Sequence, residues 1–262
     1  MKKYFLDLFS GIGGFALAAY QAGLRFDGHY FSEVDAYATK IYEKRFIGSK
    51  CLGDIRNIKT STLPRGAWII TGGFPCQDIS VAGKGAGLAG ERSGLWYEYA
   101  RIIEEIKPRF AIVENVGRLA SKGLKEVLMS LAKIGYDAEW QDIRASDVGA
   151  PHRRERLWII AYSNRNGQCD SAVNAEMGSS SKIDVSNFES TECPRIGRDS
   201  RKRKSKSRCG GWWKTEPRVG RVVNGISSRV DRYRLKCLGN SIVPEIAKMI
   251  FENKEFDFWR VK

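Results

Sequence analysis

One stretch of the chain combines the pattern of a buried strand with a reactive side chain: WIITGGFPCQDIS, residues 68–80. Its apolar start predicts a buried strand, and the two glycines that follow predict a turn at the end of that strand. Open α/β sheets bind ligands at the carboxyl ends of their strands, so Cys76 is placed for nucleophilic chemistry. Free cysteine is also among the most buried residue types, and Cys76 alone fits a packing role equally well.

Strand and helix patterns alternate on both sides of this stretch. Apolar runs typical of strands occupy residues 4–9, 29–33, 68–71, 110–114, 136–144 and 157–162. Apolar positions three and four residues apart predict helices over residues 15–22, 36–46, 95–106 and 124–133. This alternation predicts an α/β domain over residues 1–162, with a mostly parallel sheet covered by helices.

The composition changes abruptly after Tyr162. Residues 163–230 are rich in Ser, Asn, Gly, Lys and Arg and predict a smaller second lobe or a long insertion. Near the end of the chain, Pro244 is placed to begin a helix with one apolar face, which predicts that residues 231–262 return to the first domain. A chain of 262 residues is long enough for both lobes.

The charge of the chain points to a polyanionic partner. The formal net charge is +14, and residues 195–208 form a dense basic run. Such a run binds phosphates or forms a solvated loop. The six cysteines include no C-x-x-C pair, and we expect no metal. The sequence also lacks a membrane-spanning stretch and a secretion signal, so we expect a cytoplasmic protein that makes no use of a membrane.

Three further motifs lie before residue 68, and the first two are at the ends of predicted strands. DLFSGIGGF, residues 7–15, predicts a glycine-rich turn that opens a helix and lets a ligand approach the backbone. Its G-x-G-G spacing differs from the usual dinucleotide fingerprint. Glu33 is an acid suited to ribose hydroxyls or a solvated strand end. Asp54 could accept a hydrogen bond from an adenine amine or simply form a turn.

Charged side chains also follow the later strands. Burial at a strand end could raise the pKa of Glu114 and make it a proton donor, although a helix cap or a salt bridge is an equal alternative. Arg154 and Arg156 alternate along a predicted strand and therefore face the same side. Their guanidinium groups could enter one pocket or contact phosphates at the surface.

Taken in order, these motifs resemble those of the DNA cytosine methyltransferases that methylate carbon 5. The matching segments are DLFSGIGGF, FSEVD, GDI, GGFPCQDIS, ENV, QDIRASDVGAPHRRERLWIIA and RLKCLGNSIVP. The resemblance covers residues 1–162 and about 221–262. It implies a Rossmann-like S-adenosylmethionine-dependent methyltransferase domain over residues 1–162, a target recognition domain over 163–230, and a returning segment over 231–262.

The resemblance also implies a role for each residue of the site. Cys76 would attack carbon 6 of cytosine, Glu114 would protonate or hydrogen-bond N3, and Arg156 would hold O2 with Arg154 close by. S-adenosylmethionine would supply the methyl group and leave as S-adenosylhomocysteine. The residues implied to line its pocket are Phe9, Gly11, Gly13, Gly14, Glu33, Asp54, Pro75 and Asn240. The loop after Cys76 is implied to close over DNA, and its expected DNA contacts are Gln77, Ser80 and Lys84.

The implied partner is double-stranded DNA, from which a monomer would extrude the target base. A restriction endonuclease could accompany it, or the protein could be an orphan or phage protection methylase. One alternative is an RNA cytosine-5 methyltransferase of the same superfamily, whose Cys-Phe-Thr signature this sequence lacks. Another is an inactive DNA-binding relative, which would not need Cys76, Glu114 and Arg156 together. A nucleotide-binding dehydrogenase fits least well.

Overall fold

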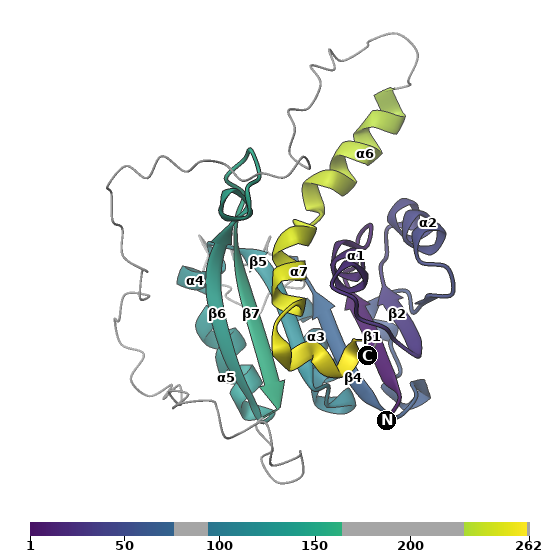
Figure 1. Ribbon diagram of the computed structural model, residues 1–262, viewed down its shortest axis with the longest axis vertical. Coiled ribbons are helices and arrows are strands. Elements are labelled where there is room, and N and C mark those ends of the chain that lie inside the picture. The colour runs from purple at the N-terminus through teal and green to yellow at the C-terminus, as the bar shows by residue number, and fades with distance from the viewer. Residues whose placement is uncertain (76–93, 164–227, 261–262) are drawn as a thin grey trace.

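The computed structural model describes residues 1–75, 94–163 and 228–260 (Figure 1). Within these ranges seven strands form one sheet in the order β3-β2-β1-β4-β5-β7-β6. The strands are β1 (Lys3–Leu8), β2 (Gly28–Ser32), β3 (Lys50–Cys51), β4 (Ala67–Gly72), β5 (Phe110–Val116), β6 (Tyr136–Arg144) and β7 (Glu155–Ser163). Strands β1 to β5 pair in parallel, whereas β7 runs antiparallel to both of its neighbours.

Helices cover both faces of the sheet. They are α1 (Gly14–Gln21), α2 (Ala36–Arg45), α3 (Gly94–Ile106), α4 (Leu119–Lys122), α5 (Leu124–Lys133), α6 (Ser228–Asn240) and α7 (Pro244–Phe251). Short 3-10 turns occupy Ile55–Asn57, Thr60–Thr62, Ala145–Val148 and Lys254–Trp259. Helices α1, α2 and α7 share one apolar core, and α3, α4 and α5 share the other. Figure 1 shows α7 beside α1 and α6 extending away from the sheet.

The two cores follow from the alternation of side chains along each strand. In β1, Leu6 and Leu8 enter the core under α3 and α5, whereas Phe5 enters the core under α1 and α7. Every residue of β4 is buried. A parallel strand covered on both faces must be apolar on both, which explains why the central strands read as continuous apolar runs.

The parallel strands bring their carboxyl ends to one edge of the sheet. There β1 runs into a turn in which Phe9 and Gly11 both have positive φ values, 52° and 53°. Such a conformation is uncommon for a residue other than glycine, so Phe9 is held there by its surroundings. Because α7 packs against α1, the segment before Pro244 also reaches this edge.

The predicted fold class is confirmed. All six predicted strands and all four predicted helices before residue 163 are present, with ends within two residues of those expected. The sequence did not predict α6, which runs continuously across the expected boundary at residue 230. The helix beginning at Pro244 is also present. In the part of the chain that is described, no helix is long and apolar enough to cross a membrane.

Candidate active site

The carboxyl edge of the sheet carries two groups of polar residues. One lies at the ends of β1 and β2 and is called here the β1–β2 half. The other lies at the end of β5 and the start of β7 and is called the β5–β7 half. The antiparallel pairing places Arg156 opposite Val116, so the start of β7 meets the end of β5.

Glu114 and Arg156 form the centre of the β5–β7 half. They lie on adjacent strands and face the same side of the sheet, and Arg156 Nε is 3.1 Å from Glu114 Oε1. Glu114 is 9% exposed. Burial raises the pKa of the Glu114 carboxyl above its ordinary value, and the nearby positive charges of Arg156 and Arg154 oppose that rise. Glu114 is therefore a buried carboxyl group that retains a proton more readily than a solvated one.

The segment that leads to Cys76 passes directly beside Glu114. A Cβ atom placed on Gly73 would stand 2.8 Å from Glu114 Oε2, so only glycine lets the backbone pass so close. The side-chain Nδ2 of Asn115 donates a hydrogen bond to the carbonyl of Phe74 at 3.1 Å. Phe74 is buried, whereas Pro75 is exposed. Two neighbouring residues of β5 therefore fix the backbone immediately before Cys76.

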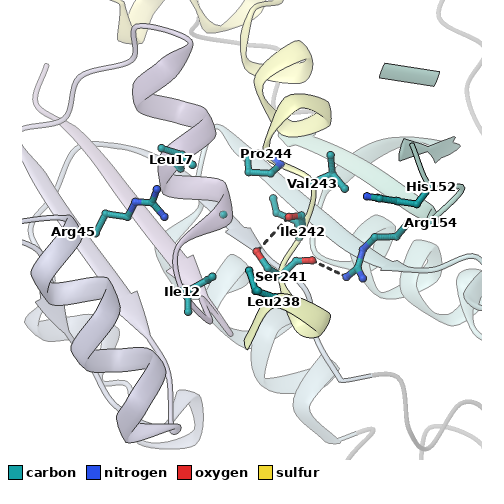
Figure 2. A pocket seen from close by; sticks show the side chains of 11 residues that line it. Ile12, Leu17, Arg45, His152, Arg154, Leu238, Ser241, Ile242, Val243 and Pro244 are labelled. Carbon is teal, nitrogen blue, oxygen red and sulfur yellow. Dashed lines mark hydrogen bonds between the residues drawn. The ribbon is translucent and has the colours of Figure 1, made fainter. Parts of the chain in front are cut away.

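Arg154 has a different set of contacts from Arg156. Its Nη1 donates to the carbonyl of Gly239 at 3.0 Å, and its Nη2 donates to the carbonyl of Ser241 at 2.6 Å. Figure 2 shows the second of these bonds at the rim of a pocket. The structure thus brings Arg154 to the segment that contains Asn240, an exposed residue at the end of α6.

Glu33 organises the β1–β2 half. Its Oε2 accepts a hydrogen bond from the backbone N–H of Gly11 at 2.8 Å, and its Oε1 accepts from the N–H groups of Val34 and Asp35 at 2.9 and 2.8 Å. The carboxylate at the end of β2 therefore holds the glycine-rich turn after β1. A carboxylate has about four acceptor sites, so Glu33 can still accept a hydrogen bond from a ligand.

Asp54 caps the 3-10 turn Ile55–Asn57 and pairs with Arg56. Its Oδ1 accepts from the backbone N–H of Arg56 at 3.0 Å, and its Oδ2 lies 2.5 Å from Arg56 Nη2. The hydrogen bond from Arg56 lowers the pKa of Asp54. The turn-forming alternative for Asp54 is therefore seen in the structure, and an adenine contact would have to share its carboxylate with Arg56.

The glycines of the first turn have unlike surroundings. At Gly11 an added Cβ would meet nothing within 4 Å, which leaves space for a ligand beside the backbone. At Gly13 it would overlap the Phe46 ring, and at Gly14 it would stand 2.5 Å from Ile242 Cγ1. Gly13 and Gly14 thus permit close packing of the protein against itself, a function that the glycine pattern alone could not distinguish from ligand binding.

A buried polar chain lies beneath this turn. Asp7 Oδ1 accepts from the Thr71 hydroxyl at 2.9 Å, and Asp7 Oδ2 accepts from the Tyr42 hydroxyl at 3.1 Å. Tyr42 Oη lies 2.8 Å from His29 Nε2, and His29 Nδ1 lies 3.1 Å from Tyr20 Oη. Burial raises the pKa of Asp7 to about 8 and lowers that of His29 to about 4. Sequence reasoning assigned no role to Asp7 or His29.

Several predicted residues lie outside the described ranges. These are Cys76 and the expected DNA contacts Gln77, Ser80 and Lys84. Of the other predicted residues, Phe9 lies at the end of β1, with its ring centroid 6.4 Å from that of Tyr99. Asn115 was missed, although it directly follows Glu114 in the motif that was singled out. Its amide at the end of a buried strand was the signal that could have identified it.

Comparisons with known proteins identify relatives of this chain. A family model for C-5 cytosine-specific DNA methylase matches residues 4–210. The Type II methyltransferase M.HhaI of Haemophilus parahaemolyticus is 37% identical over 164 residues, which are 61% of this chain and 49% of the relative. The Type II methyltransferase M.NgoBI of Neisseria gonorrhoeae is 37% identical over 163 residues, with corresponding shares of 61% and 50%. The chain spans about half the length of the curated relatives it matches.

A solved structure shares the fold. The S. pombe Dnmt2 methyltransferase superposes with a TM-score of 0.52 at 20% sequence identity, and the match covers 64% of this chain and 52% of that chain. At this level of identity the likeness concerns the fold alone. It agrees with the Rossmann-like, mostly parallel sheet described above.

Proposed function

This chain belongs to the C-5 cytosine-specific DNA methylase family, and we propose that it transfers a methyl group from S-adenosylmethionine to carbon 5 of cytosine in duplex DNA. We assign catalysis to residues 1–162, target recognition to residues 163–230, and completion of the cofactor pocket to the returning segment 231–262. The family match covers residues 4–210, which are nearly all of the first region and most of the second, although most of the second lies outside the described residues.

The contacts of Glu114 are the observation that supports the proposal most directly. The buried Glu114 carboxyl contacts the backbone that precedes Cys76 on one side and the guanidinium group of Arg156 on the other. A nucleophile, a proton donor and a fixed cation are the groups that an addition to a pyrimidine ring requires. Asn115 supports the arrangement by holding the Phe74 carbonyl. A DNA-binding module would have no use for such a set.

In this mechanism the thiolate of Cys76 forms a bond to carbon 6, and the former C5–C6 double bond leaves its electron pair on carbon 5. When bound, S-adenosylmethionine would supply an electrophilic methyl group to the electron pair on carbon 5, and its sulfur would keep the electrons of the broken S–CH3 bond to give S-adenosylhomocysteine. Once carbon 5 carries the methyl group, it loses its proton to solvent, and the electron pair restores the double bond and expels the Cys76 thiolate.

Glu114 and Arg156 act on the cytosine ring during the addition. Glu114 donates a proton or a hydrogen bond to N3 as negative charge develops on the ring, and its raised pKa favours the protonated form needed for this step. Arg156 holds the carbonyl oxygen O2 and offers a fixed positive charge. Because both side chains emerge from paired strands, their separation is set by the sheet rather than by a loop.

The β1–β2 half fits the cofactor of this reaction. Glu33 has acceptor capacity left for a ribose hydroxyl, and the space beside Gly11 admits a ligand against the backbone. Phe9, Asp54, Pro75 and Asn240 are the other described residues that we assign to this pocket. Gly13 and Gly14 shape it from behind, since each faces a protein side chain. This proposal requires no metal.

The proposed substrate and setting follow from the family and from charge. A net charge of +14 provides sequence-independent attraction for DNA phosphates. Carbons 5 and 6 are inaccessible inside a duplex, so the target base must leave the helix, and Gln77, Ser80 and Lys84 are assigned to the loop that closes over the DNA. We propose a monomer in the cytoplasm of a prokaryotic cell, serving restriction-modification or protection of DNA.

The test is transfer of labelled methyl groups from S-adenosylmethionine to unmethylated duplex DNA, with the product mapped by bisulfite sequencing. We expect 5-methylcytosine in one short sequence context. Cys76→Ser should abolish the product, whereas Cys51→Ser, which changes an exposed cysteine on β3, should retain full activity. DNA that carries 5-fluorocytosine should trap the wild type covalently because elimination cannot proceed, and it should not trap Cys76→Ser.

Other outcomes would identify the alternatives. Transfer to RNA with none to DNA would favour an RNA cytosine methyltransferase. Tight DNA binding with neither transfer nor trapping would contradict the proposed chemistry and indicate an inactive relative.

A further inference from the structure

Arg154 joins the two halves of the site, and its contacts differ from those expected of a residue that holds the base. Its two terminal nitrogens donate to the carbonyls of Gly239 and Ser241, the residues on either side of Asn240. Figure 2 shows the bond to Ser241. A guanidinium group is a rigid planar fork, so two such bonds fix both the position and the orientation of the segment they hold.

Arg154 donates to the carbonyl of Gly239, which α6 leaves free at its end, and to the carbonyl of Ser241 just beyond the helix. The last four carbonyls of a helix have no partner within it, and they form the negative end of the helix dipole. The N–H of Ser241 satisfies the carbonyl of Cys237 at 3.0 Å, and Arg154 satisfies that of Gly239. A cation is therefore the favourable partner at this end of α6.

The same segment rests directly on the glycine-rich turn. An added Cβ on Gly14 would stand 2.5 Å from Ile242 Cγ1, so the Ile242 side chain packs directly against the Gly14 backbone. Arg154, Ser241, Ile242 and Gly14 also line one pocket of about 540 Å³. Contacts thus run without interruption from Arg154 through the segment around Asn240 to the turn that follows β1.

Arg154 also lies beside the β5–β7 half, because it directly precedes the first residue of β7. Arg156, two residues further along the chain, pairs with Glu114, and the charges of both residues act on Arg154. The Arg154 side chain is only partly exposed, and burial lowers its pKa, with a smaller lowering from the charge of Arg156. Its Nε is buried without a hydrogen-bond partner among the described residues. The two carbonyls are therefore its fixed partners.

We propose that Arg154 is a positioning residue for the methyl donor: it holds Asn240 in the cofactor pocket and so couples that pocket to the base-binding pair of Glu114 and Arg156. This inference rests on the proposed function, because it takes Asn240 to be a cofactor contact. The proposal gives different roles to Arg154 and Arg156, which the sequence analysis placed in one site. Arg156 acts on the cytosine, whereas Arg154 acts through the returning segment on the affinity for the donor.

Equilibrium binding of S-adenosylhomocysteine, measured by calorimetry, tests whether Arg154 acts on affinity for the donor. This measurement does not require enzymatic activity. Arg154→Ala should weaken binding at least about tenfold, because a charge-assisted pair of hydrogen bonds is lost. Arg154→Lys keeps the charge but cannot satisfy both carbonyls, so its affinity should be intermediate. Arg153→Ala, which removes an exposed neighbouring arginine, should bind like the wild type. Circular dichroism and thermal melting of each variant establish that it is folded.

Steady-state kinetics supply a second, independent readout. Arg154→Lys should raise KM for S-adenosylmethionine and leave kcat within about threefold of the wild type, whereas Arg156→Lys should lower kcat and leave S-adenosylhomocysteine binding unchanged. Asn240→Ala should weaken S-adenosylhomocysteine binding, and adding Arg154→Ala to it should cost little more, since residues that act through one another are not additive.

The proposal is overturned if Arg154→Lys and Arg154→Ala bind S-adenosylhomocysteine as the wild type does, or if their defect lies in kcat alone. It is also overturned if Asn240→Ala leaves binding unchanged. A wild type that binds S-adenosylhomocysteine but methylates no DNA would contradict the proposed function, and the binding series would still decide the role of Arg154.

Discussion

The two halves of the carboxyl edge differ in how their charged groups are paired. In the β1–β2 half, both oxygens of Glu33 accept backbone N–H bonds, and Asp7 receives hydrogen bonds from Thr71 and Tyr42. In the β5–β7 half, the buried Glu114 Oε1 has only the ion pair with Arg156 Nε at 3.1 Å, and Arg154 Nε is buried and lacks a hydrogen-bond partner within the described residues. The hydroxyl of Ser10 is the corresponding exception in the β1–β2 half.

We infer from this difference that the fold itself completes the β1–β2 half, whereas the β5–β7 half is left for a ligand to complete. Buried polar atoms without partners are costly, and they persist where function requires them. The β1–β2 half satisfies its carboxylates with the chain's own N–H and O–H groups, so its geometry is set before any ligand binds. The β5–β7 half holds the Glu114 carboxyl and the Arg156 guanidinium group, whose remaining hydrogen-bonding capacity fits a polar ring.

The largest expected effect would come from breaking the β5–β7 half at Glu114. Glu114→Gln keeps the size of the side chain but cannot supply a proton, so kcat should fall about 10²- to 10⁴-fold. Binding of S-adenosylhomocysteine should be unchanged, because the β1–β2 half is complete without Glu114. Methyl transfer to duplex DNA and calorimetry measure the two effects.

The matched control is Glu126→Gln, which alters an exposed carboxylate on α5 and should leave the rate unchanged. If Glu114→Gln instead retained wild-type kcat, its carboxyl would serve only the ion pair with Arg156. The charge-neutral amide would then show its effect in stability alone.

The same contrast explains how much of the molecule the sequence could predict. The strands and helices before residue 163 were predictable because their apolar alternation is strong and local. The proximity of Glu114, Arg156 and the segment before Cys76 could be expected, since all three lie at ends of neighbouring strands.

Contacts between distant segments could not be predicted from the sequence. Arg154 and Arg156 have the same chemistry and lie two residues apart, yet the return of the chain after α6 gives them different partners. Gly14 matches a ligand-binding pattern but faces Ile242, a residue more than two hundred positions away. The hydrogen bond between Asp7 and Tyr42 likewise depends on how α2 packs on β1.

The next effect concerns the buried polar chain under the β1–β2 half and its dependence on pH. The pKa of Asp7 is about 8 in the fold and 3.8 in the unfolded chain, so the folded state binds more protons between these values and the free energy of unfolding falls as pH rises. The pKa of His29 is about 4 in the fold and 6.5 in the unfolded chain, so His29 makes the free energy of unfolding rise with pH between these values. This rise offsets the fall caused by Asp7 up to pH 6.5. Between pH 6.5 and 8 the contribution of Asp7 alone should lower stability by about 2 kcal/mol.

Asp7→Asn should remove this decline, because an amide does not titrate. Urea unfolding at pH 6.5 and pH 8 measures it, with Asp137→Asn, an exposed position on β6, as the control that keeps the wild-type slope. An unchanged slope in Asp7→Asn would show that Asp7 is already ionised in the fold.

A smaller effect tests how the returning segment closes the β1–β2 half. Alanine is a better helix former than glycine by about 1 kcal/mol, so Gly14→Ala at the first turn of α1 would stabilise the protein if the site were open. Contact with Ile242 should reverse the sign and destabilise the protein by about 1 kcal/mol. Ile242→Ala in the same chain should remove that penalty, so the double variant should be more stable than the sum of the two changes predicts.

Gly94→Ala provides the reference for this experiment. It lies at the first position of α3, and an added Cβ there would meet nothing within 4 Å. Thermal unfolding should show it to be neutral or stabilising. A stabilised Gly14→Ala would mean that Ile242 moves aside at little cost, and the returning segment would then be loosely held.

The smallest expected change in stability concerns Asp54. Its two candidate roles, capping the 3-10 turn and contacting adenine, predict different effects on cofactor binding. Asp54→Asn keeps an oxygen that can cap the turn and loses only an ion pair with the largely exposed Arg56, so the free energy of unfolding should change by less than about 1 kcal/mol. If the carboxylate also accepts a hydrogen bond from the adenine amine, affinity for S-adenosylhomocysteine should fall about tenfold although the fold is unaffected. Arg56→Ala is the control: it frees the carboxylate, so it should preserve or strengthen binding. Equal binding by Asp54→Asn and the wild type would limit Asp54 to its cap and leave Glu33 as the carboxylate of the β1–β2 half that recognises the nucleoside.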